Sequence, residues 1–214
     1  MTVKAVFFDL DGTLIDSLPS ISATFKAVRR KMGLDFPLEL PLSLVGIPLI
    51  DIARETVGLA RTEEFLHYYA DFYGKCCQNT LVLFPGIADL LQFLFVKQIK
   101  MAIITSKRIT STSANLKLLD IAQYFDTIVT PELLQHPKPD PEAVLLALEK
   151  TATAKEDALM VGDTYYDIAA GVNAGVGTIA VTWGNYDEIK LFAAKPNHVV
   201  NSVPELKALI ASLL

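Results

Sequence analysis

The pattern of apolar and polar residues divides the chain into three stretches. The first is a short apolar run, Val6–Phe8, which has no helical period and ends at a group of polar residues. Such a run before a turn signal predicts a buried parallel strand. Between about residues 15 and 82, apolar side chains recur at helical spacing, as at Ile21, Phe25, Val28 and Met32. We expect this second stretch to be entirely helical.

In the third stretch, after residue 83, strands and helices alternate. Further apolar runs predict strands at 100–105, 125–130, 158–162, 178–182 and 198–200. Helices are expected at 87–96, 113–119, 141–150, 167–174 and from Pro204. This alternation predicts an α/β fold with right-handed βαβ units, in which helices cover both faces of a doubly wound, Rossmann-like parallel sheet. Because the first strand precedes the helical stretch, we expect a discontinuous core of residues 1–14 and 83–214 and an inserted all-α cap of residues 15–82.

Composition and charge narrow the class of protein. The chain has 214 residues, and its net charge of −5 argues against nucleic-acid or anionic-membrane binding, which needs clustered positive charge. No apolar run approaches the roughly 18 residues that span a bilayer, and no signal peptide is recognised. Cys76 and Cys77 are adjacent and suggest no disulfide framework. We therefore expect a cytoplasmic protein, either a monomer or a homodimer.

A pair of carboxylates directly follows the first apolar run. Asp9 and Asp11 come at the carboxyl end of the predicted strand, where open α/β sheets bind ligands, and they point to the same side. Two neighbouring carboxylates repel, and a divalent cation such as Mg²⁺, which prefers oxygen ligands, removes that conflict. Gly12 allows a close backbone approach to a ligand, and Thr13 adds a hydroxyl. Taken alone, the stretch also fits a plain turn after a strand.

Three later stretches follow predicted strands in the same way. Thr105 and Ser106 offer hydroxyls beside backbone N–H groups, a plausible phosphate cradle. Lys138 lies between prolines in KPDP, where a stiff loop could present its charge to phosphate. Asp163 ends another strand, and Asp167 lies one helical turn further on. Taken singly, the first stretch also fits a turn, the second a surface lysine and the third an N-cap. Together, the stretches place carboxylates, a lysine and hydroxyls at one sheet edge.

These four stretches resemble the sequence motifs of the haloacid dehalogenase superfamily. The motifs are DLDGT at 9–13, TS at 105–106, Lys138 in KPDP, and GDTYYD at 162–167. Their order and spacing match over essentially the whole chain, and the DxDGT form is that of the superfamily's phosphatases. The helical insertion resembles the small cap of the subgroup that contains phosphoglycolate phosphatases, pyrophosphatases, sugar phosphatases and β-phosphoglucomutases. Ser106 departs from the asparagine of many phosphoglycolate phosphatases.

The resemblance implies a mechanism with a covalent intermediate. Asp9 would attack phosphorus and form a phospho-aspartate, and Asp11 would act as general acid and then general base. Mg²⁺ would be held by Asp9, Asp163 and the main-chain carbonyl of Asp11, while Asp167 would orient ligands from a second layer.

The same resemblance assigns the phosphate contacts. Thr105, the amide of Ser106 and Lys138 would bind the phosphoryl oxygens and neutralise the charge that builds there, and Lys138 would thereby assist catalysis. Gly12 and Thr13, in the first motif, would also bind the phosphate of the substrate.

The substrate is the least determined part of the prediction. The loop at Gly46 and Ile47 resembles one that reaches the substrate in related caps, and Arg54 and Lys107 are possible anion contacts. For Arg54, the pattern favours a solvated position on a helix over an anion contact. A small phosphorylated metabolite is expected, with 2-phosphoglycolate as the first choice. A pyrophosphatase or a β-phosphoglucomutase-like phosphomutase is the alternative, and a phospho-acceptor regulatory module is a more distant one.

Overall fold

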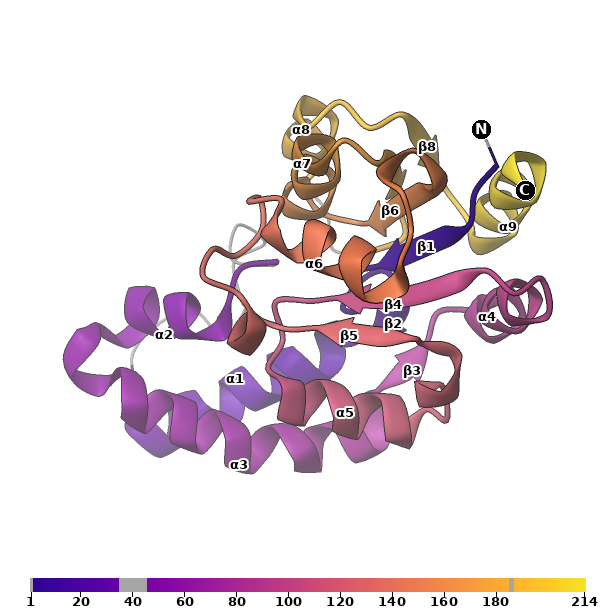
Figure 1. Cartoon of the computed structure of the whole chain (residues 1–214). Coiled ribbons are helices and arrows are strands. Elements are labelled where there is room, and N and C mark those ends of the chain that lie inside the picture. Colours follow the sequence, from indigo (N-terminus) through magenta and orange to yellow (C-terminus); the bar gives the residue numbers. More distant parts are fainter. Residues whose placement is uncertain (1, 35–45, 185–186) are drawn as a thin grey trace.

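The computed structural model describes residues 2–34, 46–184 and 187–214, and its centre is a six-stranded parallel sheet (Figure 1). The strand order is β5-β4-β1-β6-β7-β8. The strands are β1 (Ala5–Phe8), β4 (Lys100–Ile104), β5 (Thr127–Val129), β6 (Ala158–Gly162), β7 (Gly177–Val181) and β8 (His198–Val200). The prediction of a doubly wound α/β fold with a helical insertion is therefore confirmed.

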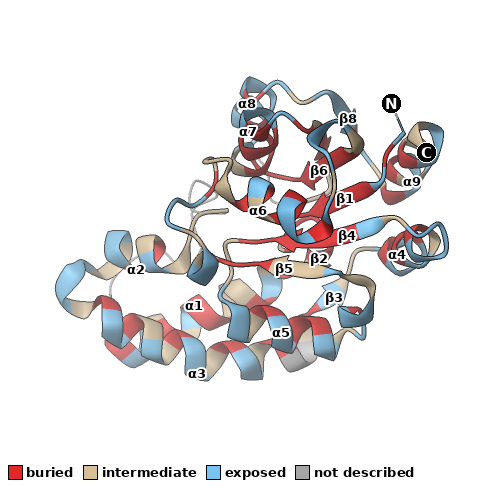
Figure 2. Cartoon of the chain, in the orientation of Figure 1, coloured by how far each residue is buried: buried red, intermediate tan, exposed pale blue. Residues whose placement is uncertain are grey.

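Strand β1 lies at the middle of the sheet because apolar side chains occupy both of its faces. Val6 and Phe8 belong to one hydrophobic cluster, whereas Ala5 and Phe7 belong to another on the opposite face, and all four residues are fully buried. The first cluster includes residues of α4 (Ile87–Val96), α5 (Ile109–Leu118) and α9 (Val203–Leu213). The second includes residues of α6 (Glu142–Thr151) and α7 (Tyr165–Ala174). Figure 2 shows the resulting buried layer along the strands.

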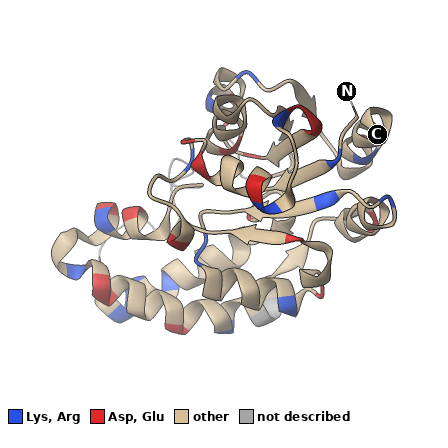
Figure 3. Ribbon diagram, in the orientation of Figure 1, with Lys and Arg blue, Asp and Glu red and all other residues tan. Residues whose placement is uncertain are grey.

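The helical insertion lies between β1 and β4 in sequence. Its described residues form α1 (Leu18–Met32), α2 (Leu49–Val57) and α3 (Thr62–Thr80), with a short 3-10 helix at Leu59–Arg61. Helices α1 and α3 run side by side, and the ring of Phe25 lies 5.5 Å from the rings of both Phe65 and Tyr69. Basic and acidic positions are interspersed along α2 and α3 (Figure 3).

The expectation that residues 15–82 contain no strand was wrong at both ends of that stretch. Strands β2 (Ile15–Asp16) and β3 (Val82–Leu83) pair antiparallel, with Ile15 opposite Leu83. The chain leaves the core and returns to it at the same place, so the two backbones satisfy each other's hydrogen bonds. Two residues are too few to show a period of two in the sequence.

Other differences concern short helices and helix ends. Helix α8 (Glu188–Ala193) was not predicted, nor were 3-10 helices at Ala122–Tyr124, Pro131–Leu133 and Lys155–Asp157. Helix α5 begins at Ile109, four residues before the predicted start. The pattern missed its first turn because that turn carries few apolar residues. None of the helices within the described residues is long and apolar enough to cross a membrane.

The central strand provides a test of this packing. Phe7→Ala should lower the free energy of unfolding by about 3–5 kcal/mol, because the fully buried ring leaves a cavity that the sheet and helices cannot fill. Phe95→Ala is the matched control, because Phe95 is 53% exposed on α4 and should lose about 1 kcal/mol or less. Urea denaturation followed by circular dichroism measures both values. Equal losses for the two variants would contradict the proposed importance of β1.

Candidate functional site

The site lies at the carboxyl edge of the sheet, where three neighbouring strands end. Strand β1 pairs with β4 on one side and β6 on the other, so Asp9, Thr105 and Asp163 follow adjacent strands. The amide of Asp9 still donates a hydrogen bond to the carbonyl of Val161 at 2.9 Å, which holds the start of the loop in register with β6. Residues far apart in sequence thus meet because of the strand order.

Three carboxylates and one ammonium are buried together at this edge. Asp9, Asp163 and Asp167 each offer an oxygen, and these oxygens lie within 4.8 Å of one another. The Nζ of Lys138 donates to Asp9 Oδ1 at 2.7 Å, to Asp167 Oδ1 at 2.5 Å and to the carbonyl of Ile104 at 3.2 Å. Hard oxygen donors in this number suit a divalent cation such as Mg²⁺.

Burial and charge shift the proton affinities in this cluster. Burial raises the pKa of Asp9 well above its ordinary value, and the nearby ammonium of Lys138 only partly offsets that effect. Burial alone would lower the pKa of Lys138, but the charges of Asp167 and Asp9 outweigh it and raise the pKa. Lys138 is therefore a permanent positive charge beside the carboxylate expected to act as nucleophile.

Asp167 is held by the first turn of helix α7. The amide of Thr164 donates to Asp167 Oδ2 at 3.0 Å, and the hydroxyl of Thr164 donates to the same oxygen at 2.6 Å. The two residues form a capping box, in which the Asp167 carboxylate accepts from the amide of Thr164 and the Thr164 hydroxyl accepts from the amide of Asp167. This leaves the other Asp167 oxygen to Lys138, in keeping with the orienting role expected for Asp167.

Two glycines permit the close approach of loops to Asp163. Gly12 has a φ of +88°, and a Cβ on it would lie 2.2 Å from Asp163 Oδ2. Gly184, which the sequence analysis missed, is equally constrained, because its Cβ would lie 2.3 Å from the same oxygen and 2.2 Å from the carbonyl oxygen of Gly12. The signal available was a glycine shortly after a predicted strand.

Thr13 and Trp183 brace these loops. The hydroxyl of Thr13, expected beside the phosphate, donates to Asp163 Oδ1 at 3.1 Å. The Nε1 of Trp183 donates to the carbonyl of Thr13 at 3.1 Å. Thr13 therefore positions a carboxylate in this structure, while Trp183 ties the loop after β7 to the loop after β1.

Asp11 pairs with a lysine instead of joining the carboxylate cluster. Its two carboxylate oxygens lie 2.9 and 2.8 Å from Lys107 Nζ, which also donates to the hydroxyl of Tyr73 at 2.8 Å. The side-chain amide of Asn115 donates to the same hydroxyl at 3.1 Å. Burial alone would lower the pKa of Lys107, but the charge of Asp11, its hydrogen bond to Lys107 and smaller contributions from Tyr69 and Cys77 together raise the pKa. From the sequence, Lys107 was a possible anion contact and Asn115 had no role.

The loop after β4 contacts the insertion as well as the core. The Thr105 hydroxyl accepts a hydrogen bond from the amide of Lys107 at 3.1 Å, which shapes the expected phosphate cradle. The Ser106 hydroxyl donates to the carbonyl of Gly46 at 2.8 Å, so the side chain connects the core to the insertion. Gly46 has a φ of +92°, and a Cβ there would lie 3.1 Å from side-chain atoms of Thr164 and Tyr166.

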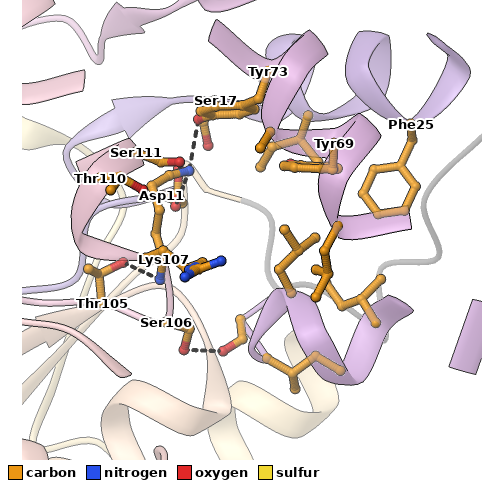
Figure 4. A pocket seen from close by; sticks show the side chains of 18 of the residues that line it. Asp11, Ser17, Phe25, Tyr69, Tyr73, Thr105, Ser106, Lys107, Thr110 and Ser111 are labelled. Atoms are coloured by element: carbon orange, nitrogen blue, oxygen red, sulfur yellow. Dashed lines mark hydrogen bonds and ion pairs between the residues drawn. The ribbon is translucent and has the colours of Figure 1, made fainter. Parts of the chain in front are cut away.

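A pocket lies between this edge of the sheet and the helical insertion (Figure 4). The core contributes Asp9, Asp11, Thr105, Ser106, Lys107, Arg108, Thr110 and Ser111 to its lining. The described insertion residues in the lining are Ser17, Leu18, Ile21, Phe25, Gly46, Ile47, Leu49, Ile52, Leu66, Tyr69, Ala70 and Tyr73. Gly46 and Ile47 thus reach the pocket as expected, whereas Arg54 lies on α2 outside this lining and pairs with Asp51 at 3.2 Å.

Comparison with known proteins agrees with this geometry. The haloacid dehalogenase-like hydrolase family matches residues 6–181. Pyrophosphatase PpaX of Oceanobacillus iheyensis is 30% identical over 210 residues, which is 98% of each chain. Pyrophosphatase PpaX of Bacillus velezensis is 32% identical over 205 residues, 95% of this chain and 94% of that one.

Solved structures extend the likeness to three dimensions. A haloacid dehalogenase-like family hydrolase from Streptococcus pneumoniae has a TM-score of 0.83 at 27% identity and covers 97% of this chain and 98% of its own. A predicted phosphoglycolate phosphatase from Haemophilus somnus has a TM-score of 0.90 at 22% identity over 98% of each chain, which is a likeness of fold. Because the family matches residues 6–181 and relatives of about 30% identity cover nearly the whole chain, the chain belongs to the haloacid dehalogenase-like hydrolases.

Proposed function

We propose that this hydrolase is a Mg²⁺-dependent phosphatase that transfers a phosphoryl group first to Asp9 and then to water. The observation that carries the proposal is the buried cluster of Asp9, Asp163 and Asp167 around Lys138, beside the pocket. A carboxylate can serve as a covalent nucleophile, and phosphoryl transfer depends mainly on positioning and on compensation of negative charge. The cluster offers both at one edge of the sheet.

The donor set suits Mg²⁺ as the cofactor. Asp9 and Asp163, with the main-chain carbonyl of Asp11, would hold the ion. Asp167 would orient these ligands from a second layer. Bound Mg²⁺ would neutralise charge on the phosphoryl oxygens. Thr13 holds one oxygen of Asp163 and Lys138 holds one oxygen of Asp9, so the carboxylates are fixed in orientation before a metal binds.

The residues of the chain account for both halves of the reaction. A carboxylate oxygen of Asp9 attacks phosphorus, and the bond from phosphorus to the leaving oxygen breaks. Asp11 gives that oxygen a proton, for which the carboxylate that pairs with Lys107 in this structure must first take up a proton. Asp11 then takes a proton from water, the water oxygen attacks phosphorus, and the bond to Asp9 breaks with release of inorganic phosphate. Lys138, Thr105 and the amide of Ser106 stabilise the phosphoryl oxygens in both steps.

The helical insertion would act as a cap over this reaction, with residues 1–14 and 83–214 as the catalytic core. The hydrogen bond from Ser106 to the carbonyl of Gly46 and the contact of Gly46 with Thr164 connect the two parts beside the pocket. A closed insertion excludes bulk water from a reactive phospho-aspartate. The division into core and cap is thus part of the same proposal.

Pyrophosphate hydrolysis is the second candidate. The two PpaX relatives, at 30% and 32% identity over nearly the whole chain, are named pyrophosphatases. The protein described as a phosphoglycolate phosphatase is 22% identical, so it bears on the fold alone. The relatives therefore support the pyrophosphatase alternative better than 2-phosphoglycolate, the first choice from sequence. The same residues would cleave a phosphoanhydride, with phosphate as the leaving group.

Replacement of the nucleophile is the primary test. Asp9→Asn keeps the shape of the side chain but removes the attacking oxyanion, so turnover should fall on the order of 10³-fold or more. Release of inorganic phosphate from a panel of phosphate esters and pyrophosphate measures this loss. Asp71→Asn, on the exposed surface of α3, is the matched control and should keep full activity. An Asp9→Asn enzyme with a tenth of the wild-type rate would refute the assignment.

Metal dependence is the second test. Activity should vanish with EDTA and return with Mg²⁺, and Asp163→Ala should raise the half-saturating Mg²⁺ concentration at least about tenfold, since an oxygen ligand is lost. Calcium should inhibit, because its larger and looser coordination shell would misplace Asp9. Asp89→Ala, on the exposed face of α4, should leave the Mg²⁺ titration unchanged. Full activity after exhaustive chelation would rule out the metal-dependent mechanism.

The contact between insertion and core gives a third test. Gly46→Val should lower kcat/KM about tenfold or more and change the ranking of substrates, because a β-branched residue is strained at a φ of +92° and crowds Thr164. The Mg²⁺ concentration for half activity should barely move, since no proposed ligand lies in the insertion. Gly58→Val provides the control, because Gly58 has a φ of +72° but an open environment away from the pocket. A loss of Mg²⁺ affinity with kcat/KM and the ranking of substrates unchanged would contradict this role of Gly46.

A further inference from the structure

We infer that this site prefers phosphate monoesters of compact apolar alcohols over substrates with an anionic leaving group, such as pyrophosphate or 2-phosphoglycolate. The inference rests on the proposed function and names the substrate class of the same site. It comes from the side of the pocket that faces the catalytic carboxylates across the cavity, where the leaving group must lie once phosphorus is beside Asp9.

That side of the pocket is an apolar wall made by the insertion. The wall consists of Ile21, Phe25, Leu49, Ile52, Leu66 and Tyr69. Phe25 and Tyr69 are packed against each other with ring centroids 5.5 Å apart, so their positions are set by the core of the insertion (Figure 4). The described insertion residues in the lining carry no charge, and their polar groups include the neutral hydroxyls of Ser17 and Tyr73. A neutral hydroxyl can donate a hydrogen bond but cannot neutralise an anion.

The two basic residues in the described lining are already engaged by carboxylates. Lys107 lies 2.8 Å from Asp11 Oδ2 with its side chain 10% exposed. The Nε of Arg108 lies 3.4 Å from Glu132 Oε1, and the arginine side chain is 64% exposed, so solvent screens its charge. A second negative charge on the leaving group would have to be desolvated against the apolar wall without a dedicated cation, which is unfavourable. Lys138 and the proposed metal serve the transferred phosphoryl group instead.

The residues outside the described ranges add no basic side chain. Residues 1, 35–45 and 185–186 contain no lysine, arginine or histidine. In contrast, an apolar leaving group gains from burial in proportion to the area it removes from water. The pocket has a volume of about 140 Å³, and its lining includes Asp9, Thr105 and Ser106, so this space must hold the phosphoryl group as well as the leaving group. The wall therefore fits a branched or cyclic group of a few carbons.

A homologous series of alkyl phosphates tests the inference on the wild-type enzyme. From methyl to pentyl phosphate the leaving alcohols have similar acidity, so intrinsic reactivity changes little along the series. The value of kcat/KM should rise by about fourfold per methylene until the cavity is filled. Isobutyl phosphate and 2-phosphoglycolate form a matched pair, because an isopropyl group replaces a carboxylate with the same number of heavy atoms. Isobutyl phosphate should be preferred at least about tenfold, and it should also exceed pyrophosphate.

A charge introduced into the wall should reverse this preference. Leu66 is half-buried in the lining, so Leu66→Lys can place an ammonium at the pocket and should shift the isobutyl phosphate to 2-phosphoglycolate ratio at least about tenfold toward the anion. Leu59→Lys adds the same charge to the insertion at a residue that is 80% exposed and outside the lining, and should leave the ratio unchanged. A general electrostatic effect would move both variants alike and contradict the role of the wall.

The outcomes separate this inference from the proposed function. If Asp9→Asn is inactive but the alkyl series is flat, or pyrophosphate or 2-phosphoglycolate is the better substrate, the inference is overturned and the phosphatase stands. If no ester or anhydride releases phosphate with Mg²⁺ present, the proposed function is overturned and the inference with it. A rising series together with a preference for isobutyl phosphate supports both.

Discussion

The ammonium of Lys138 lies between two buried carboxylates, and the geometry of the site depends on this compensation of charge. Asp9, Asp163 and Asp167 would repel one another at the end of the sheet, and the two short contacts from Lys138 offset part of that repulsion. Removing one partner of such a group leaves an uncompensated buried charge, which is strongly destabilising. The arrangement is possible because β1 lies between β4 and β6, so that loops from separate parts of the chain reach one point. The remaining excess of carboxylate oxygens is the chemical reason to expect a cation there.

Much of this arrangement could be predicted from the sequence because parallel strands place their carboxyl ends at one edge. The six strands were visible as short apolar runs. Asp9, Thr105 and Asp163 directly follow β1, β4 and β6, whereas Lys138 comes nine residues after the end of β5, beyond a 3-10 helix at Pro131–Leu133. No knowledge of strand order was needed to expect the motifs on the same side of the sheet. Strands β2 and β3 escaped prediction for a different reason, since their pairing arises from the return of the chain to the core and has no local pattern.

The partners of individual side chains could not be predicted, because they depend on contacts across the whole chain. Lys107 was a possible anion contact from the sequence, and in the structure it pairs with Asp11, 96 residues away in sequence. The ring of Tyr73 stacks on Tyr69 with centroids 5.5 Å apart, yet its hydroxyl receives hydrogen bonds from Lys107 and Asn115. Periodicity identifies the buried face of a helix but not the polar atom that emerges at the end of that face.

Core and insertion are under separate physical constraints, and this affects how far the names of relatives extend to this chain. The catalytic edge needs charged groups in a narrow geometry, so related proteins can share it at 30% identity. The insertion touches that edge at Gly46 through a backbone carbonyl, which accepts from Ser106 whatever side chains line the pocket. The apolar wall can therefore change in sequence without breaking the contact between the two parts. Because the same edge can work beneath walls of different polarity, the substrate has to be inferred from the wall of this chain, and here that wall is uncharged.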